Sequence, residues 1–150
     1  MKIELKIINF PVINNFETQI AFFKILSNKR IQKKYKTQYQ HLFQCLIFKK
    51  LLNIKSNKII NLYEIDIKHK ALTYEYFPSI NLRQRLKLSQ EIRQAEMIEI
   101  FKKMALAIDF LHNKRIVHID INDTNFLINE ELEIKLNDYD FIEILTKNNQ

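Results

Sequence analysis

The sequence contains no glycine in 150 residues. Glycine lets the backbone adopt left-handed angles and approach a ligand closely, and for this reason phosphate groups are commonly cradled by glycine-rich loops. A mechanism that depends on such a loop is therefore excluded for this chain. Its chemistry must come from side chains held on ordinary strands, helices and turns.

The composition predicts one domain with a substantial core. Hydrophobic residues make up 47% of the sequence, which is too much for a chain that is disordered throughout. No apolar run is long enough to cross a bilayer, and residues 1–10 lack the unbroken apolar region of a signal peptide. Cys45 is the single cysteine and cannot form an internal disulfide. We therefore expect a cytoplasmic or otherwise intracellular protein with no membrane partner.

The charge is positive and unevenly distributed. The net charge is +7, and no acidic residue occurs between Glu17 and Glu64, a segment rich in lysine. Such a segment can attract nucleic acid, but a solvated lysine-rich helix face is the commoner explanation. We favour the helix face, and we do not expect nucleic acid to be a partner.

The hydrophobic periods predict an α+β chain with an antiparallel sheet. Strand-like runs are expected near residues 3–9, 18–26, 59–67 and 70–76. A helix is expected near 31–54, because Leu42, Phe43, Leu46, Ile47 and Leu51 form an apolar stripe.

A second region follows the predicted sheet. Ser89 is a plausible N-cap for a long helix near 90–112, whose apolar residues recur at helical spacing. A polar loop comes next, and the sequence ELEIKLNDYDF then alternates as a β-ribbon does.

Residues 116–128 read IVHIDINDTNFLI and place acids and amides between apolar residues. A calcium-binding EF-hand loop is one explanation, since Asn122, Leu127 and Glu131 fit its pattern counted from Asp120. However, Asn125 stands where that loop needs glycine, and the flanking residues are extended rather than helical in pattern. A loop that holds a catalytic base and a magnesium ligand for phosphate transfer explains more of these residues.

Several segments resemble the motifs of the protein kinase family. HIDINDTN resembles the catalytic loop H-R-D-L-x-x-x-N, and IKLNDYDF resembles the strand and magnesium-binding turn that carry D-F-G. IAFFK is similar to the V-A-I-K strand, LTYEYF to the hinge, and IFKKMALAIDFLHNKRIVH to the helix that leads into the catalytic loop. The resemblance covers residues 5–145 in family order.

The resemblance implies an incomplete, protein-kinase-like α+β domain over residues 1–150. Residues 1–73 would form the small lobe, an antiparallel sheet with one helix, and residues 74–77 the hinge. Residues 78–150 would begin the helical large lobe, with the catalytic loop and the magnesium-binding turn. The family activity is phosphoryl transfer from ATP to serine or threonine of proteins, with ATP and Mg²⁺ as cofactors.

The resemblance also assigns roles to individual residues. Asp120 would orient the attacking hydroxyl, and Lys24 and Asn125 would complete the catalytic set. Lys24 would bind the nucleotide phosphates, while Asn125 and Asp138 would hold Mg²⁺. The adenine base would contact Ala21, Leu127 and backbone groups from Glu75 to Phe77. Tyr74 would be the gatekeeper, and the hydrophobic spine would consist of Leu51, Leu62, His118 and Tyr139.

Some family residues are replaced. Ile119 stands in place of the arginine of H-R-D, Asn122 in place of the loop lysine, and Asp140 in place of the glycine of D-F-G. No acidic residue in 18–63 is available to pair with Lys24. We therefore expect impaired transfer, although Asp120→Asn should leave nucleotide binding nearly unchanged.

Two other functions stay open. One is a pseudokinase, a binding module that acts through a partner; the chain stops at Gln150, before the later large-lobe helices, so a protein partner is expected to cover the long helix. The other is a small-molecule kinase of the aminoglycoside, choline or lipopolysaccharide kinase type.

Overall fold

The computed structural model describes residues 22–26, 30–34, 48–88, 93–140 and 142–145, with the side chains of 22–25 excepted. The chain divides into two compact units: residues 1–54 with 61–76, and residues 55–60 with 77–150. The division of the chain between Tyr76 and Phe77 falls within the predicted hinge, residues 74–77. The assignment of residues 1–73 and 78–150 to two lobes stays a prediction. The strand expected near 3–9, the adenine contact Ala21 and the N-cap Ser89 lie outside the described residues.

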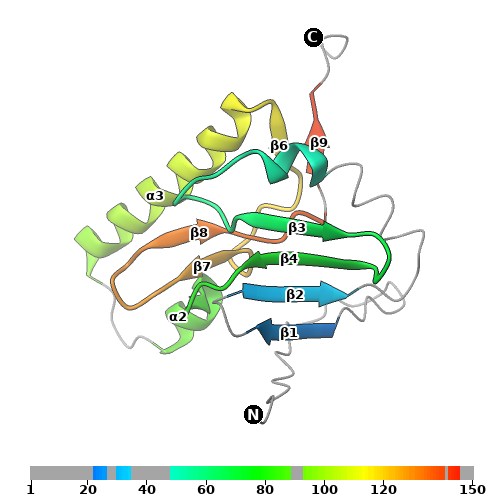
Figure 1. Cartoon of the computed structure of the whole chain (residues 1–150). Helices are drawn as coiled ribbons and strands as arrows, with labels where there is room; N and C mark the ends of the chain where they lie inside the picture. The colour runs from blue at the N-terminus through cyan, green and yellow to red at the C-terminus, as the bar shows by residue number, and fades with distance from the viewer. Residues whose placement is uncertain (1–21, 27–29, 35–47, 89–92, 141, 146–150) are drawn as a thin grey trace, which may run out of the picture. The chain divides into compact units, whose positions relative to one another are not determined.

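The first unit contains a four-stranded antiparallel sheet (Figure 1). Its strands are β1 (Phe22–Leu26), β2 (Arg30–Lys34), β3 (Leu62–Asp66) and β4 (Ala71–Glu75), in the order β1-β2-β4-β3. The strands predicted near 18–26, 59–67 and 70–76 are confirmed where the structure describes them.

Strand β2 corrects the helix predicted near 31–54. Residues 48–52 are helical, but Arg30–Lys34 form a strand that pairs with β1 on one edge and with β4 on the other. The apolar stripe that indicated the helix begins only at Leu42. Hydrogen bonds to β1 and β4 therefore decide the conformation of residues 30–34, which have little hydrophobic period of their own.

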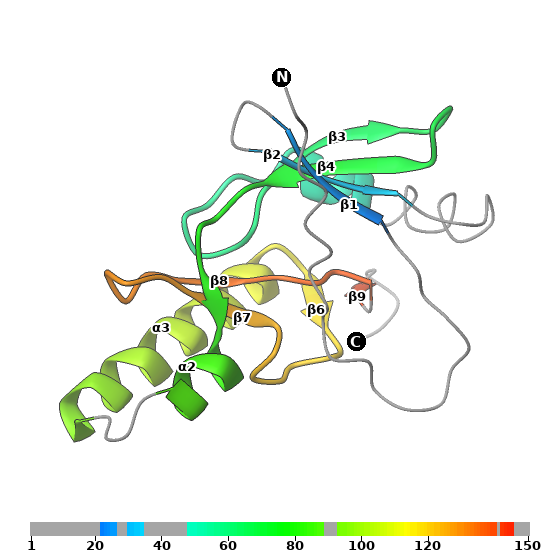
Figure 2. The same ribbon diagram turned by 90° about the horizontal axis from the view of Figure 1, so that it is seen from below.

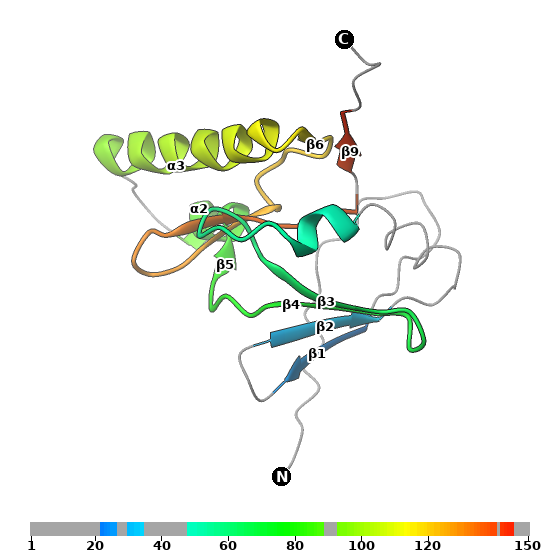
Figure 3. The ribbon, with the colours of Figure 1, turned by 45° about the horizontal axis from the view of Figure 1, so that its top comes forward.

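The core of the first unit lies on strand β4 and the helical segment 48–52. Ala71, Leu72 and Tyr74 are buried, and so is Phe48 of the helical segment. The rings of Phe48 and Tyr74 meet edge to face, with their centroids 6.4 Å apart and an interplanar angle of 81°. The helical segment thus covers the face of the sheet that carries Tyr74 (Figure 3).

The second unit combines two helices with two small sheets. Its elements are β5 (Ile80–Asn81), α2 (Leu82–Leu88), α3 (Gln94–Asn113), β6 (Ile116–His118), β7 (Phe126–Ile128), β8 (Ile134–Leu136) and β9 (Ile142–Ile144). One sheet has the order β5-β7-β8, and β6 pairs with β9. Helix α3 packs against β6 and β8 (Figure 2). Together with the sheet of the first unit, these elements confirm the predicted α+β fold class.

Helix α3 is the long helix expected near 90–112, but it begins at Gln94. Its N-cap is Arg93, whose side chain makes no capping hydrogen bond. Ile100, Ala107 and Leu111 are buried along one face. On the other face Ile98 is 61% exposed and Phe101 is 59% exposed. Among the described residues, no helix combines the length and hydropathy needed to span a membrane.

The flanks of the polar loop exclude the calcium-binding alternative. An EF-hand needs a helix on both sides of its loop. Here the loop is preceded by strand β6, and β8 (Ile134–Leu136) lies where the second helix would start. The phosphate-transfer interpretation is therefore the one that agrees with the fold.

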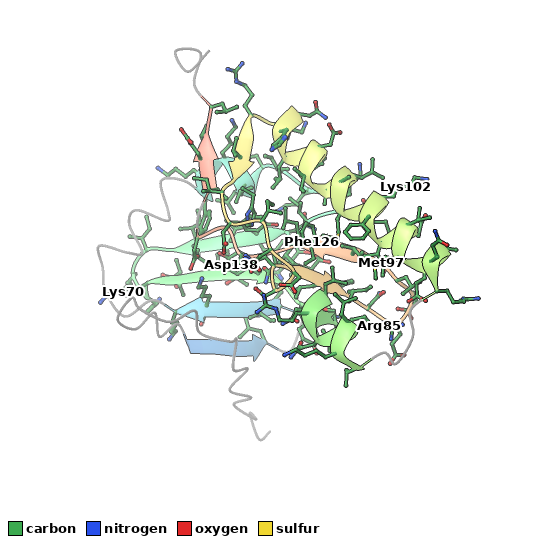
Figure 4. All side chains as sticks on the ribbon, turned by 180° about the vertical axis from the view of Figure 1, so that it is seen from behind. Lys70, Arg85, Met97, Lys102, Phe126 and Asp138 are labelled. Atoms are coloured by element: carbon green, nitrogen blue, oxygen red, sulfur yellow. The ribbon has the colours of Figure 1, made fainter. Side chains whose placement is uncertain are left out.

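Turns without glycine use other residues in the left-handed region. The described residues with positive φ are Lys70 (54°), Arg115 (58°), Leu132 (59°) and Asp138 (61°). Lys70 ends the turn between β3 and β4, where its N–H donates to the Ile67 carbonyl at 3.4 Å (Figure 4). Left-handed angles strain a residue that has a Cβ, by about 1–2 kcal/mol.

We predict that Lys70→Gly raises the free energy of unfolding by about 0.5–1 kcal/mol, because the strain that is relieved exceeds the entropy that glycine gains in the unfolded chain. Urea unfolding followed by circular dichroism measures the change. Lys68→Gly is the matched control, since Lys68 lies in the same turn without a positive φ, and it should lower stability. Equal losses in both variants would contradict the explanation.

Candidate functional site

The polar loop 119–125 connects strands β6 and β7 in the second unit. The strands on either side bury Ile116, His118, Phe126 and Ile128, so both ends of the loop are fixed by the core. Buried apolar residues thus flank a short polar segment, and this arrangement explains why acids and amides stand between apolar residues in 116–128.

Asp120 is held by two amide side chains of its own loop. The Asn122 amide nitrogen donates to Asp120 Oδ1 at 2.9 Å, and the Asn125 amide nitrogen donates to Oδ2 at 2.9 Å. Asn125 also donates to the Asp120 carbonyl at 2.9 Å. The carbonyl oxygen of the Asn122 side chain accepts the Thr124 N–H at 2.9 Å and also the Thr124 hydroxyl. The neutral amide of Asn122 therefore helps to orient Asp120. The resemblance to the kinase loop predicts a lysine at this position.

Asn125 joins the loop to the turn that carries Asp138. Asn125 is 7% exposed, and its backbone carbonyl accepts the Asn137 N–H at 2.8 Å. This bond brings together the two segments that contain the predicted metal ligands, Asn125 and Asp138. The amide nitrogen of Asn125 is already bonded to Asp120, so its carboxamide oxygen is the atom that would ligate a cation.

The donor set fits Mg²⁺ better than a metal that needs many protein ligands. Within the described part of the chain, no group of three or more histidine, cysteine or acidic residues lies together. Mg²⁺ usually retains several waters and takes only one or two carboxylates from the protein. One carboxylate from Asp138 and one amide oxygen from Asn125 match that habit.

The turn at Asp138 is anchored by Tyr139. The Tyr139 ring is buried, and its hydroxyl lies 2.8 Å from the Leu136 carbonyl oxygen and 3.0 Å from the Ile60 carbonyl oxygen. The left-handed Asp138 precedes it, and the Asp140 N–H approaches Asp138 Oδ1 at 3.4 Å (Figure 4). A fixed Tyr139 limits the rotation of the backbone on which the Asp138 carboxylate stands.

Two residues predicted for the hydrophobic spine are in contact. The rings of His118 and Tyr139 meet edge to face with centroids 6.1 Å apart. His118 Nε2 lies 2.9 Å from the Asn137 carbonyl oxygen, so strand β6 is tied to the same turn. Leu51 and Leu62 are buried in the first unit.

Lys135 lies next to the two predicted adenine contacts of the second unit, Phe77 and Leu127. Leu127 pairs with Lys135 across β7 and β8, so both positions share a face of the ribbon. Lys135 is 8% exposed, and its Nζ lies 5.2 Å from the centre of the Phe77 ring. Lys135 could have been noticed as a charged residue within an otherwise apolar strand.

Glu75, the first of the predicted backbone contacts for adenine, is bonded within the first unit. Its backbone N–H donates to the Asn61 carbonyl at 2.8 Å. Its carboxylate Oε2 accepts the Asn61 amide at 2.7 Å. The N–H of Glu75 is therefore engaged by Asn61.

The sheet register places the predicted phosphate contact, Lys24, and a second lysine, Lys33, on different faces of the sheet. Lys24 on β1 pairs with Gln32, and Gln32 pairs with Thr73 on β4. Lys33 on β2 pairs with Leu72. Paired residues share a face of a sheet and successive residues alternate, so position 33 shares the face of Tyr74, whereas position 24 aligns with Thr73.

Lys33 was not considered for this role at the level of sequence, because its segment was assigned to a helix. The letters RIQK at residues 30–33 have the lysine at the same spacing as V-A-I-K. Lys33 is half-buried, on the strand adjacent to β4. The signal was present, but choosing between RIQK and IAFFK requires the order of the strands.

Comparison with known proteins identifies similar sequences. The family model described as the protein kinase domain matches residues 10–150. An Aurora kinase from Debaryomyces hansenii is 35% identical over 98 residues, which cover 61% of this chain and 24% of the relative. A probable LRR receptor-like serine/threonine-protein kinase from Arabidopsis thaliana is 31% identical over 141 residues, covering 85% of this chain and 14% of the relative.

A third relative is described as inactive. This serine/threonine-protein kinase from Mus musculus is 29% identical over 73 residues, covering 49% of this chain and 12% of the relative. The chain thus spans less than a quarter of the length of these three relatives.

We predict that Asp120→Asn lowers the free energy of unfolding by about 1–3 kcal/mol, because one acceptor oxygen becomes an NH₂ group facing an amide donor. The released Asn125 should also weaken Mg²⁺-dependent nucleotide binding, in contrast to the expectation from sequence alone. Urea unfolding measures the first effect and calorimetry the second.

Asp109→Asn is the control for this substitution. Asp109 accepts a single amide N–H, from Asn113 at 2.9 Å, on the exposed side of α3. Its replacement should change stability by less than about 0.5 kcal/mol. If Asp120→Asn were as stable as the wild type, the two amides would not be holding the loop.

Proposed function

The chain belongs to the protein kinase domain family, and we propose that it binds ATP with Mg²⁺ at the catalytic loop and the Asp138 turn, with phosphoryl transfer to serine or threonine slow or absent. The observation that carries this proposal is the bond from the Asn137 N–H to the Asn125 carbonyl, because it links Asn125 to the residue that precedes Asp138 within one unit.

The residues of the second unit have separate roles in this proposal. Mg²⁺, when bound with ATP, supplies the charge neutralisation that phosphoryl transfer needs. Asn125 and Asp138 would hold the cation through oxygen atoms. Asp120 would orient the attacking hydroxyl, since both its oxygens are already fixed by amides.

Three departures from the family pattern favour slow transfer. The neutral Asn122 cannot offer the charge of the family lysine, and Asp140 adds a negative charge next to the cation ligands. No acidic residue between 18 and 63 is available to orient a phosphate-binding lysine. Electrostatic stabilisation is the main source of rate in this reaction, and each tenfold loss corresponds to about 1.4 kcal/mol of barrier.

The nature of the relatives bears on the substrate. The relatives from Arabidopsis thaliana and Mus musculus are named serine/threonine-protein kinases, which favours a protein substrate over the small-molecule alternative. The low cysteine content supports the proposal of an intracellular location.

A pseudokinase that binds a protein partner is the second candidate. The exposed apolar residues on the outer face of α3, Ile98 and Phe101 among them, favour this alternative. The similarity to an inactive kinase agrees with it.

We predict that Asp138→Asn reduces the Mg²⁺-dependent gain in ATP affinity at least tenfold, because one carboxylate ligand is lost. Titration calorimetry with ATP, with and without Mg²⁺, measures the gain. Asp140→Asn is the matched control, since it removes the same charge two residues away from the proposed ligand and should reduce the gain much less. Wild-type behaviour in Asp138→Asn would contradict the metal role.

A phosphotransfer assay on a generic protein substrate completes this test. Turnover of about one per second that disappears in Asp120→Asn would show that the site is more active than we propose, because that value lies within the ordinary range of kinases. Absence of nucleotide binding under all conditions would overturn the proposal and leave the pseudokinase that binds a partner.

The lysine that contacts the phosphates is part of the same proposal. Lys24 is the residue that the motif suggests, and the sheet register supports Lys33 instead, because Lys33 shares a face with Tyr74 and lies on the strand next to β4. Adjacent strands lie about 4.8 Å apart. The backbone of a lysine on β2 is therefore one strand closer to β4, which leads into the predicted hinge, than the backbone of a lysine on β1.

We predict that Lys33→Met weakens ATP binding about tenfold, the equivalent of about 1.4 kcal/mol, whereas Lys24→Met leaves it nearly unchanged. Both substitutions remove one charge from the same sheet, so each is the control for the other. Calorimetric titration in the presence of Mg²⁺ gives the two affinities. The opposite result would restore Lys24.

A further inference from the structure

We propose that Arg83 of α2 and Asp123 of the catalytic loop form a clasp that positions Asp120 and Asn125. The structural part of this inference is independent of nucleotide chemistry. Its consequence for cation and nucleotide binding rests on the proposed function.

The clasp joins residues 40 positions apart in the sequence. Arg83 Nε donates to Asp123 Oδ1 at 3.0 Å and lies 3.1 Å from Oδ2. Arg83 Nη2 donates to Oδ1 at 2.7 Å. The Arg83 backbone N–H also donates to the Asp123 carbonyl at 3.2 Å. Helix α2 therefore holds the loop through both the main chain and a forked, charge-assisted contact, which fixes direction as well as distance.

The helix end that carries Arg83 is itself well anchored. The Asn81 side-chain oxygen accepts the Gln84 N–H at 2.8 Å, and the Gln84 side-chain oxygen accepts the Asn81 N–H at 3.1 Å. This reciprocal pair is a capping box. Asn81 also pairs with Leu127 across β5 and β7. Arg83 thus extends from a rigid first turn next to the strand that follows the loop.

The side-chain hydrogen bonds around Asp120 lie within the loop, and outside it Asn125 is bonded to the Asn137 N–H. The amide bonds to Asp120 come from Asn122 and Asn125, so they hold the members of the loop relative to one another. Asp123 lies between these two donors in sequence, and its carboxylate is turned to α2 instead. Holding Asp123 consequently fixes the backbone on both sides, and with it the two amides.

The electrostatics agree with this geometry. Hydrogen bonding from Arg83 lowers the pKa of Asp123, and the same bond raises the pKa of Arg83. The side chains are 48% and 35% exposed, so the pair resembles a surface ion pair, a class that adds little to global stability. The clasp is therefore expected to act on the local order of the loop.

Hydrogen exchange of backbone amides in the full 150-residue chain tests the clasp. Arg83→Gln should speed exchange across residues 119–125 about tenfold, with α3 unchanged. Arg85→Gln is the matched control, because Arg85 on the same helix pairs with Glu96 of α3 at 3.3 Å (Figure 4) and should leave the loop unchanged. Unchanged loop exchange in Arg83→Gln, or equal effects of both variants, would overturn the clasp.

Conservative and reversed variants separate positioning from bulk and charge. Arg83→Lys keeps the charge but loses the fork, and it should restore only part of the protection. The double variant Arg83→Asp with Asp123→Arg should protect the loop better than either single reversal. If the double variant were no better than the single ones, direct pairing would be refuted.

A titration with ATP distinguishes this inference from the proposed function. Arg83→Gln should lower the affinity measured with Mg²⁺ several-fold and leave the affinity without Mg²⁺ nearly unchanged, because the clasp acts through Asn125. Loop exchange that responds to Arg83→Gln in a chain that binds no ATP would support the clasp and overturn the proposed function. Binding of ATP with a loop that ignores Arg83→Gln would do the reverse.

Discussion

The carboxamide of Asn125 is the contact on which the candidate site depends. Its nitrogen holds Asp120, its oxygen is the atom that we propose as a cation ligand, and the backbone carbonyl of the same residue accepts the Asn137 N–H. A single buried residue thus links the group that would orient the substrate to the turn that carries Asp138. Buried polar groups are stabilising when their hydrogen bonds are satisfied, and this one is bonded on several sides.

Much of the fold was predictable because hydrophobic periods decide where strands β3 and β4 and helix α3 form. Strand β2 was not, because four of the five residues Arg30–Lys34 are polar or charged and the segment gains its conformation from two neighbouring strands. The start of α3 was also misplaced, since Arg93 offers no capping side chain to mark it. Local sequence predicts a helix or strand that its own residues stabilise. It does not predict one that is stabilised by residues distant in the sequence.

In the candidate site too, some features were predictable from the sequence and others were not. The spacing of Asp120, Asn125 and Asp138 was readable from the sequence, because it follows the spacing of the kinase motifs that the sequence resembles. The mutual orientation of Asn122 and Asn125 around one carboxylate was not readable, and neither was the pairing of Arg83 with Asp123 across the fold. The choice between Lys24 and Lys33 depends on strand order, a property that belongs to the assembled sheet.

The left-handed turns show what a glycine-free composition does to a kinase-like fold. Lys70, Arg115 and Leu132 adopt positive φ angles in turns outside the candidate site, so the fold retains the bends without the residue that makes them easily. At about 1–2 kcal/mol each, this strain is a sizeable share of the stability of a small domain. Glycine could adopt the backbone angles at these three positions, so the bends themselves do not explain why the sequence has no glycine. The lack of glycine is therefore a property of the sequence composition, which the architecture tolerates at a cost in stability.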